Sequence, residues 1–250
     1  MAVNEWERDQ AILDATAELL LKLGYDRLRM GAVADLVDLN RGLVYLRFTS
    51  KDEAVEAAVL RELDRYAEAW RAQVEADPRG GSVGSAYRAM MTALKTLPLA
   101  SAIVARDEEV FGKYVRRPGS YFDRAGGTAA TGPMSSREFL EAMRRAGVVR
   151  RDVDVRAVAF VMDGLTPAIR RAFLRSDEPP ADDEPSWDQL LGTVADMLDQ
   201  AVTPAKAPDF PAGREVLLGV LEQARAVATR SDGRSRGNPA HQQDAAEGDE

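Results

Sequence analysis

Apolar side chains recur at intervals of three and four residues along most of this chain, and such spacing is typical of amphipathic helices. No segment shows the strict apolar and polar alternation of a half-buried strand. Helices are therefore expected over residues 9–23, 30–37, 40–48, 50–76, 83–97, 103–115, 137–146, 153–174, 187–202 and 214–228. The pattern predicts an all-α fold.

The first three expected helices are short and follow one another closely. Gly24 stops the first helix, and Asp38 with Leu39 forms a tight turn before the third. Asn40 has a side chain suited to cap the third helix, which is expected to end near Phe48. The segment is thus a compact three-helix unit.

A long fourth helix is expected to follow this unit. Ser50 and Glu53 have the spacing of a capping box, in which the hydroxyl and the carboxylate each accept from free backbone N–H groups. The helix should end near Ala76, and the Pro and Gly residues within 77–82 indicate a hinge between two domains. Further breaks are expected at Pro98 and at residues 117–119, 126–133, 177–185 and 204–211.

Composition narrows the class of protein. The chain has 250 residues, of which 45% are hydrophobic and none is cysteine, so disulfides and cysteine metal sites are excluded. No uninterrupted apolar run approaches the length of a membrane span, and the acidic residues near the N-terminus do not resemble a secretion signal. We therefore expect a cytoplasmic protein that makes no membrane contact.

Side chains suited to catalysis are scarce. The only histidine, His241, lies in the segment 230–250, whose apolar residues are all alanine and which we expect to be disordered. The acidic clusters at 107–109 and 182–184 are typical of solvated surface, and the glycines at 126–127 have no following lysine to bind phosphate. We expect no enzyme activity, no cofactor and no metal site.

The net charge of −8 argues against a surface coated in nucleic acid but leaves a local basic patch possible. Residues 39–51 contain Arg41, Arg47, Lys51 and Tyr45 and no acidic side chain. A helix that enters the major groove needs donors and small residues outside and apolar residues inside, and this segment has both. The alternative is that residues 28–48 are two packed helices of a larger core.

Several landmarks within residues 12–53 occur together. They are Ile12-Leu13-Asp14-Ala15, Leu19 to Tyr25, Val33-Ala34, Gly42, Tyr45, Phe48 and Ser50-Lys51. This pattern resembles the DNA-binding head of the tetracycline-repressor (TetR) family of transcriptional regulators. The resemblance implies a helix-turn-helix domain over 9–53, preceded by a flexible arm over 1–8. It also implies a helical ligand-binding and dimerisation domain over 54–229, in which 54–76 is the connecting helix.

The function implied by the resemblance is ligand-responsive regulation of transcription. A homodimer would bind a near-palindromic operator in double-stranded DNA as a repressor, and a small apolar effector would release it. The alternative is a helical protein-interaction module whose degenerate head no longer binds DNA. Salt-dependent DNA binding would separate the two.

The resemblance also assigns roles within the third helix. It implies that Asn40, Arg41, Leu43 and Tyr45 face the groove, that Gly42 permits close approach of backbone to DNA, and that Arg47 and Lys51 meet phosphates, whereas Val33, Val44 and Phe48 form the scaffold. Four positions depart from the family pattern. Leu46 stands where a polar or aromatic residue is common, and Arg29 stands where a hydroxyl residue often caps the second helix. The other two are Asp38 and Leu43. Asp38 stands where the turn usually has glycine, and must adopt the left-handed conformation. Leu43 replaces a common threonine, so an apolar contact such as one with a thymine methyl replaces a hydrogen bond.

Large or pliable side chains between residues 83 and 165 are candidates for an apolar ligand pocket. We nominate Tyr87, Met91, Phe111, Tyr114, Phe122, Met143 and Phe160, from a wider set that includes Met90, Tyr121, Phe139 and Met162. The alternative at each position is plain core packing, because buried helices need the same residues.

Two apolar seams near the end of the chain are candidates for dimerisation. Two helices from each subunit would form a four-helix interface, which is where family members dimerise. The nominated residues are Val158, Met162, Leu165, Ile169, Leu191, Val194 and Leu198. The alternative is that both seams face the core of their own subunit.

Overall fold

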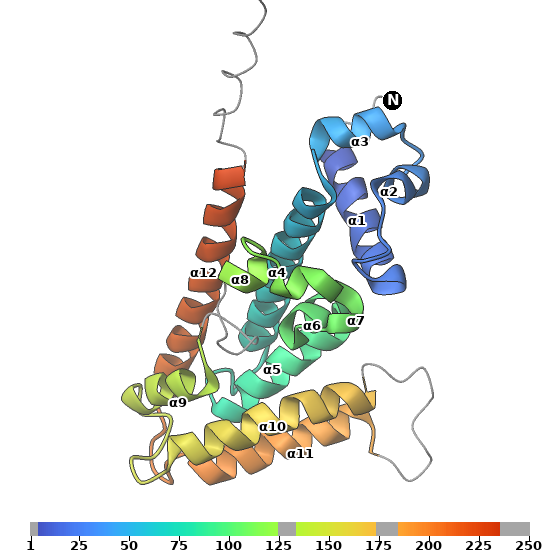
Figure 1. The fold of residues 1–250 in the computed structure, drawn as a ribbon. Helices are drawn as coiled ribbons and strands as arrows, with labels where there is room; N and C mark the ends of the chain where they lie inside the picture. The colour runs from blue at the N-terminus through green and yellow to red at the C-terminus, as the bar shows by residue number, and fades with distance from the viewer. Residues whose placement is uncertain (1–4, 125–133, 174–184, 236–250) are drawn as a thin grey trace, which may run out of the picture.

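The computed structural model describes residues 5–124, 134–173 and 185–235, and the ordered elements within these ranges are all helical (Figure 1). The expected all-α class is confirmed. The elements are α1 (Glu5–Leu23), α2 (Met30–Leu36), α3 (Arg41–Arg47), α4 (Lys51–Ala76), α5 (Val83–Thr96), α6 (Pro98–Ala105), α7 (Glu108–Phe111), the 3₁₀ helix η1 (Gly112–Arg116), α8 (Tyr121–Arg124), α9 (Ser136–Arg145), α10 (Val155–Phe173), α11 (Trp187–Val202) and α12 (Phe210–Ser235).

Both ends of the described chain are more helical than expected. Helix α1 begins at Glu5, so residues 5–8 are not part of a flexible arm. Helix α12 continues to Ser235, so the tail expected to be disordered from residue 230 is helical over its first six residues. His241, the glycines at 126–127 and the acidic cluster at 182–184 lie outside the described residues.

The single helix expected over 103–115 is wrong. Arg106 adopts a left-handed conformation (φ 50°) that ends α6, and Asp107 then caps the short α7 by accepting from the backbone N–H of Glu109. The break expected at Pro98 is confirmed, because α5 ends at Thr96 and Pro98 starts α6 at its first turn, where a missing N–H has no consequence. Arg106 is not a residue type that predicts such a break, and the local signal in the sequence is Asp107, a favoured N-cap residue.

Two hydrophobic cores organise the chain. The head core joins α1, α2, α3 and the first half of α4, but it also contains Leu99, Ile103, Phe111 and Phe122 from the α6–α8 segment. The body core lies between the second half of α4 and helices α5, α9, α10, α11 and α12, and it also contains Ala100 and Val104 of α6. Helix α6 therefore contributes to both cores, whereas Phe111, Tyr114 and Phe122 from the rest of the α6–α8 segment pack on the head (Figure 1).

The turn between α4 and α5, expected to be a hinge, is instead a buried and hydrogen-bonded junction. Asp77 accepts from the Ser85 hydroxyl at 2.8 Å and from the Arg88 guanidinium at 2.6 Å. Arg214 of α12 donates to the backbone carbonyl of Gly80 at 2.7 Å and to that of Asp77 at 2.9 Å. The body core continues across this turn, so it is not a boundary between domains.

Helices α5 and α11 approach each other closely at Gly84. Its backbone N–H donates to the Asp199 carboxylate at 2.7 Å, and a Cβ placed on it would lie 2.1 Å from the carbonyl oxygen of Ala195. A side chain there must push the helices apart. We expect Gly84→Ala to lower the free energy of unfolding by about 1 to 3 kcal/mol, as overpacking of a core does, measured by urea denaturation.

Gly219 within α12 is the matched control, because a Cβ there would have no neighbour within 4 Å. We expect Gly219→Ala to be neutral or to stabilise by up to about 1 kcal/mol, since alanine is the better helix former. Equal losses of stability in the two variants would contradict the close approach of α5 to α11.

Candidate DNA-reading surface and ligand pocket

The α2–α3 unit has the geometry expected of its sequence. Asp38 takes the left-handed conformation (φ 53°), and Leu39 donates from its backbone to the carbonyl of Ala34 at 3.0 Å. The Asn40 carboxamide accepts from the backbone N–H of Leu43 at 2.9 Å and caps α3. Val44 is fully buried in the head core, so it fixes which face of α3 points inward.

The opposite face of α3 is open to solvent. Arg41, Gly42 and Leu43 are exposed, as are Tyr45 (47%) and Leu46 (78%). Residues 41–43, 45 and 46 therefore form a surface that a duplex can reach, with only Val44 among them buried. This surface lies at the end of the molecule farthest from α10 and α11 (Figure 1). Val33 and Phe48, expected to be scaffold, are buried beneath it.

Arg41 lies across the neighbouring helix α2. A Cβ placed on Gly31 would be only 2.8 Å from Nη2 of Arg41 and 2.9 Å from its Cζ. Any side chain at position 31 would therefore displace the guanidinium. The glycine leaves Arg41 room to lie flat while its donors stay exposed.

The other two basic side chains of the segment bind protein groups. Arg47 makes a two-pronged ion pair with Asp9 (2.6 and 2.7 Å) and reaches Glu5 at 3.2 Å. The hydrogen bonds to Asp9 raise the pKa of the Arg47 guanidinium. Lys51 donates to the backbone carbonyl of Tyr25 at 3.0 Å, and its Nζ lies 3.9 Å from the centre of the Tyr25 ring. Both residues tie α3 and α4 to α1 and its following turn.

The start of α4 differs in detail from a capping box. The Ser50 hydroxyl accepts from the backbone N–H of Glu53 at 3.1 Å, as expected. The Glu53 carboxylate, however, accepts from the backbone and hydroxyl of Thr49, each at 2.7 Å, instead of from the Ser50 N–H. The prediction that Ser50 donates its backbone N–H to Glu53 is therefore wrong, because Thr49 is the donor. The helix nevertheless begins where predicted.

A polar junction joins the head to the α6–α8 segment through Asp52 of α4. The Tyr25 hydroxyl donates to Asp52, and Arg117 contacts both the Asp52 carboxylate and the Tyr25 hydroxyl. Burial, followed by the hydrogen bond to Asp52, raises the pKa of Tyr25 to about 12. The neutral hydroxyl is thus the bound form at any ordinary pH.

One turn further along α4, Glu56 repeats this arrangement. Its carboxylate accepts from the Tyr114 hydroxyl and from the Arg124 guanidinium, and from the backbone N–H of Tyr121 at 3.1 Å. The Tyr25 and Tyr114 rings lie 5.3 Å apart between centres, so the two sites form one continuous junction. Two carboxylates on one face of α4 hold the head and the α6–α8 segment together.

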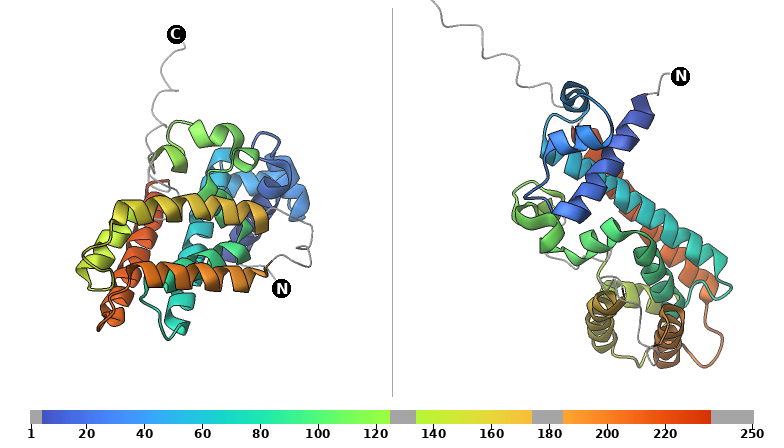
Figure 2. Two further views of the ribbon diagram at one scale, coloured as in Figure 1. Left: turned by 90° about the horizontal axis from the view of Figure 1, so that it is seen from below. Right: turned by 90° about the vertical axis from the view of Figure 1, so that its right-hand side faces the viewer.

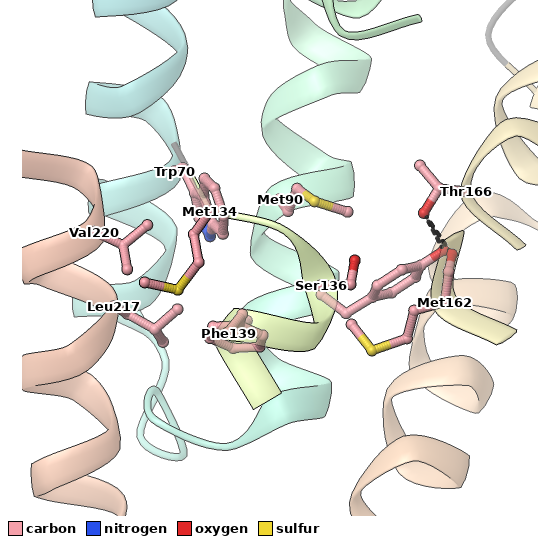
Figure 3. Close-up of a pocket in the computed structure, with 11 residues that line it drawn as sticks. Trp70, Met90, Met134, Ser136, Phe139, Met162, Thr166, Leu217 and Val220 are labelled. Carbon is pink, nitrogen blue, oxygen red and sulfur yellow. Dashed lines mark hydrogen bonds between the residues drawn. The ribbon is translucent and has the colours of Figure 1, made fainter. Parts of the chain in front are cut away.

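An apolar pocket lies at the other end of α4 (Figure 3). Its cavity is small, about 50 Å³, and among the described residues that line it the hydroxyls are those of Tyr87, Thr166 and Ser136. The lining residues come from five helices and the segment before α9: Trp70, Ala86, Tyr87, Met90, Met134, Ser136, Phe139, Met162, Thr166, Leu217 and Val220.

The polar pair inside this pocket has a defined direction. The Thr166 hydroxyl donates to the carbonyl of Met162 at 2.9 Å, so it accepts from the Tyr87 hydroxyl 3.3 Å away. Burial raises the pKa of Tyr87. Both hydroxyl protons are committed, and the free lone pairs of these oxygens are therefore acceptors for a ligand donor.

The structure places the pocket candidates in three different locations. Tyr87 lines the pocket, whereas Met91 and Met143 are fully buried elsewhere in the body core. Phe111, Tyr114 and Phe122 pack against one another in the head core, and Phe160 is 80% exposed on α10. These six side chains do not line the pocket. Trp70, Leu217 and Val220 do, and sequence reasoning missed them because they lie outside the range 83–165.

The dimerisation candidates also require correction, because their seams face the core of their own subunit. Met162, Ile169, Leu191, Val194 and Leu198 are buried in the body core, and Val158 and Leu165 pack against it. The outward faces carry a different apolar set, with Phe160 80% and Val161 52% exposed on α10 and Met197 63% exposed on α11. Seen from below, α10 and α11 form the layer nearest the viewer (Figure 2).

Comparison with known proteins finds a family model that matches the head. Residues 12–58 match the family model described as bacterial regulatory proteins, tetR family. Over 59 residues the chain is 42% identical to the HTH-type transcriptional repressor KstR of Rhodococcus jostii (strain RHA1), and equally to that of Mycobacterium tuberculosis (strain ATCC 25618 / H37Rv). The match covers 24% of this chain and 28% and 27% of the two repressors, so it spans about a quarter of their length.

Solved structures extend the likeness to the fold of the body. A tetR family protein from Shewanella sp. PV-4 is 18% identical with a TM-score of 0.52, covering 78% of this chain and 98% of its own. The regulator FadR from Bacillus subtilis, in complex with stearoyl-CoA, is 15% identical with a TM-score of 0.51, covering 77% and 98%. Among the residues that the structure describes, no helix is long and apolar enough to cross a bilayer.

The polar junction can be tested by removing one hydroxyl. We expect Tyr25→Phe to lower the free energy of unfolding by about 1 to 3 kcal/mol, because Asp52 and Arg117 lose a partly buried partner while the ring still packs on Tyr114. Urea denaturation measures the change. Tyr45→Phe, at an exposed position, is the control and should change stability by less than about 0.5 kcal/mol; a Tyr25→Phe variant as stable as this control would contradict the junction.

Proposed function

We propose that this chain, whose residues 12–58 match the tetR family of bacterial regulatory proteins, is a ligand-responsive transcriptional regulator that binds double-stranded DNA. We propose further that it acts as a repressor, as the KstR relatives are named, and binds a near-palindromic operator as a homodimer. In this proposal residues 9–53 are the DNA-binding domain and residues 54–229 carry the ligand and the dimer contacts.

A single observation carries the proposal. The matched segment forms a helix-turn-helix whose second helix buries Val44 and exposes Arg41, Gly42, Leu43 and Tyr45. A helix presented in this way fits the width of the major groove, where base edges distinguish sequences. Asn40 contributes as the cap of α3, with its carboxamide oxygen accepting from Leu43. Arg47 and Lys51 are partners for phosphates only if they leave their present contacts.

The outward faces of α10 and α11 support a homodimer. Phe160 and Val161 on α10 and Met197 on α11 are large apolar side chains that a monomer would leave in water. Two helices from each subunit would cover them in a four-helix interface. This layer lies far from α3 (Figure 1), so DNA and a second subunit would not compete for one surface.

The apolar pocket supports a small effector that is largely apolar and offers a hydrogen-bond donor to Tyr87 or Thr166. A cavity of about 50 Å³ is far smaller than the space a drug-sized ligand needs, so binding must open it. Met90, Met134 and Met162 line it, and unbranched thioether side chains rearrange readily. FadR, a protein of similar fold, was solved in complex with stearoyl-CoA, a ligand with a long apolar acyl chain attached to a polar, charged coenzyme A group.

Helix α4 gives a physical route from effector to DNA. Trp70 lines the pocket, and Asp52 and Glu56 on the same helix hold the head and the α6–α8 segment. A ligand that displaces Trp70 would therefore move the element that positions α3. Such a ligand shifts DNA affinity only by its differential affinity for the two positions of the head, so the coupling is reciprocal.

The proposed DNA binding is tested by substituting Arg41, the exposed basic side chain of α3. We expect Arg41→Ala to weaken binding to a selected operator by about 1 to 3 kcal/mol if the guanidinium forks to a base, with a smaller loss on unrelated duplexes. An equal loss on all sequences would assign Arg41 to phosphate. Fluorescence anisotropy with the full chain, over a range of salt concentrations, measures both.

Arg137→Ala is the matched control, because this arginine is exposed on α9 in the body. It should leave DNA affinity unchanged. Absence of binding to any duplex by folded parent protein would favour the second candidate function, a helical interaction module with a degenerate head. The ion pairs that hold Arg47 to Asp9 and Glu5 are the observation that keeps that candidate open.

The proposed dimer face is tested by placing a charge on it. We expect Phe160→Glu to convert dimers to monomers, because an ionised carboxylate would have to be desolvated in an apolar interface. Sedimentation velocity measures the mass of the particle. Leu21→Glu, at an exposed leucine of α1, is the control and should leave the dimer intact. If both variants dissociate, or if neither does, the result contradicts the proposal that α10 lies in the dimer interface.

A further inference from the structure

The outward face of α3 is more apolar than a DNA-reading helix requires. Leu46 is 78% exposed and Leu43 is 38% exposed, and they stand three residues apart, so they lie on the same side of the helix. Neither side chain can donate or accept a hydrogen bond. Leaving them in water has no benefit for the folded chain, because burial of apolar surface is what stabilises folding.

Two of the three basic side chains near these leucines already bind protein groups. Arg47 is bound on two edges by Asp9 and Glu5, and Lys51 is bound to the carbonyl and ring of Tyr25. Within residues 1–53 there are seven basic and ten acidic side chains, so the head as a whole attracts phosphate weakly. Asn40, Arg41 and Tyr45 remain as the polar groups of the exposed face. Specificity must therefore come largely from contacts that are not ionic.

We propose that Leu43 and Leu46 read the 5-methyl groups of pyrimidines in the major groove, so that each half-site of the operator carries thymines opposite these two side chains. This inference rests on the proposed function, since it requires that α3 enters DNA. The thymine methyl is the one apolar group on the major-groove edge of the four bases. A leucine placed against it removes apolar surface of both partners from water.

The same side chains discriminate against the other bases. Opposite cytosine, adenine or guanine, a leucine would cover amino groups, carbonyl oxygens or ring nitrogens without replacing their hydrogen bonds to water. A three-residue step along a helix advances about 4.5 Å, whereas successive base pairs are about 3.4 Å apart. Leu43 and Leu46 therefore contact adjacent base pairs, or two base pairs with one other pair between them.

The experiment removes single methyl groups from the DNA. Duplexes that bind the full-length protein are first selected from a random-sequence pool, and each thymine of the half-site is then replaced in turn by deoxyuridine, which lacks only the 5-methyl. We expect a loss of affinity on the order of fourfold per methyl at two positions and none at the others. At the same two positions, 5-methylcytosine should bind more tightly than cytosine.

Protein variants assign each methyl to its leucine. Leu43→Ala should abolish the penalty for deoxyuridine at one position and Leu46→Ala at the other, while Leu21→Ala, an exposed leucine of α1, should keep both penalties. All three positions are at the surface, and circular dichroism confirms that each variant is folded.

The outcomes separate this inference from the proposed function. Operator binding that is indifferent to deoxyuridine at every position overturns methyl reading and leaves DNA binding intact. The same holds if the penalties persist in Leu43→Ala and Leu46→Ala. Failure of folded parent protein to enrich any duplex overturns the proposed function, and methyl reading with it; the exposed leucines would then belong to a protein-binding surface.

Discussion

The tight seating of the α1–α2 turn on α7 is the constraint on which the rest of this structure depends. Gly24 is left-handed (φ 75°), and a Cβ on it would lie 2.6 Å from the carbonyl oxygen of Glu109. The next residue, Tyr25, donates from its backbone to the carbonyl of Val110 at 2.7 Å. Backbone meets backbone at this point, so the head has little freedom to move without the α6–α8 segment.

This contact explains why the hydrophobic core of the head includes residues from the middle of the chain. Phe111, Tyr114 and Phe122 fill the space beneath α1 and α4, and Asp52 and Glu56 bind the polar atoms at its rim. Asp52 and Glu56 thus connect α4 to both of these parts of the chain. The head and the α6–α8 segment share one hydrophobic core, and the pocket at Trp70 lies at the opposite end of α4.

Sequence reasoning succeeded where local chemistry decides the outcome and failed where tertiary packing decides it. The caps at Asn40 and Ser50, the stop at Gly24 and the left-handed Asp38 are local, and all were predictable. On α10, by contrast, both faces carry apolar residues at helical spacing, so periodicity alone could not tell the buried Met162 from the exposed Phe160. The pocket mixes residues from α4, α5, α9, α10 and α12, and only the fold brings these together.

The ion pairs of Arg47 illustrate how one side chain can serve the fold at the expense of binding strength. Exposed ion pairs contribute little to stability singly, but Arg47 joins the end of α3 to the start of α1 through both Asp9 and Glu5, and so fixes the angle between these two helices. Those two carboxylates would also lie near the phosphates of a bound duplex. If the chain binds DNA as proposed, non-specific attraction would be weak and tight binding would have to come from the fit of Arg41, Leu43, Tyr45 and Leu46 to base edges, which is the property that a selective regulator needs.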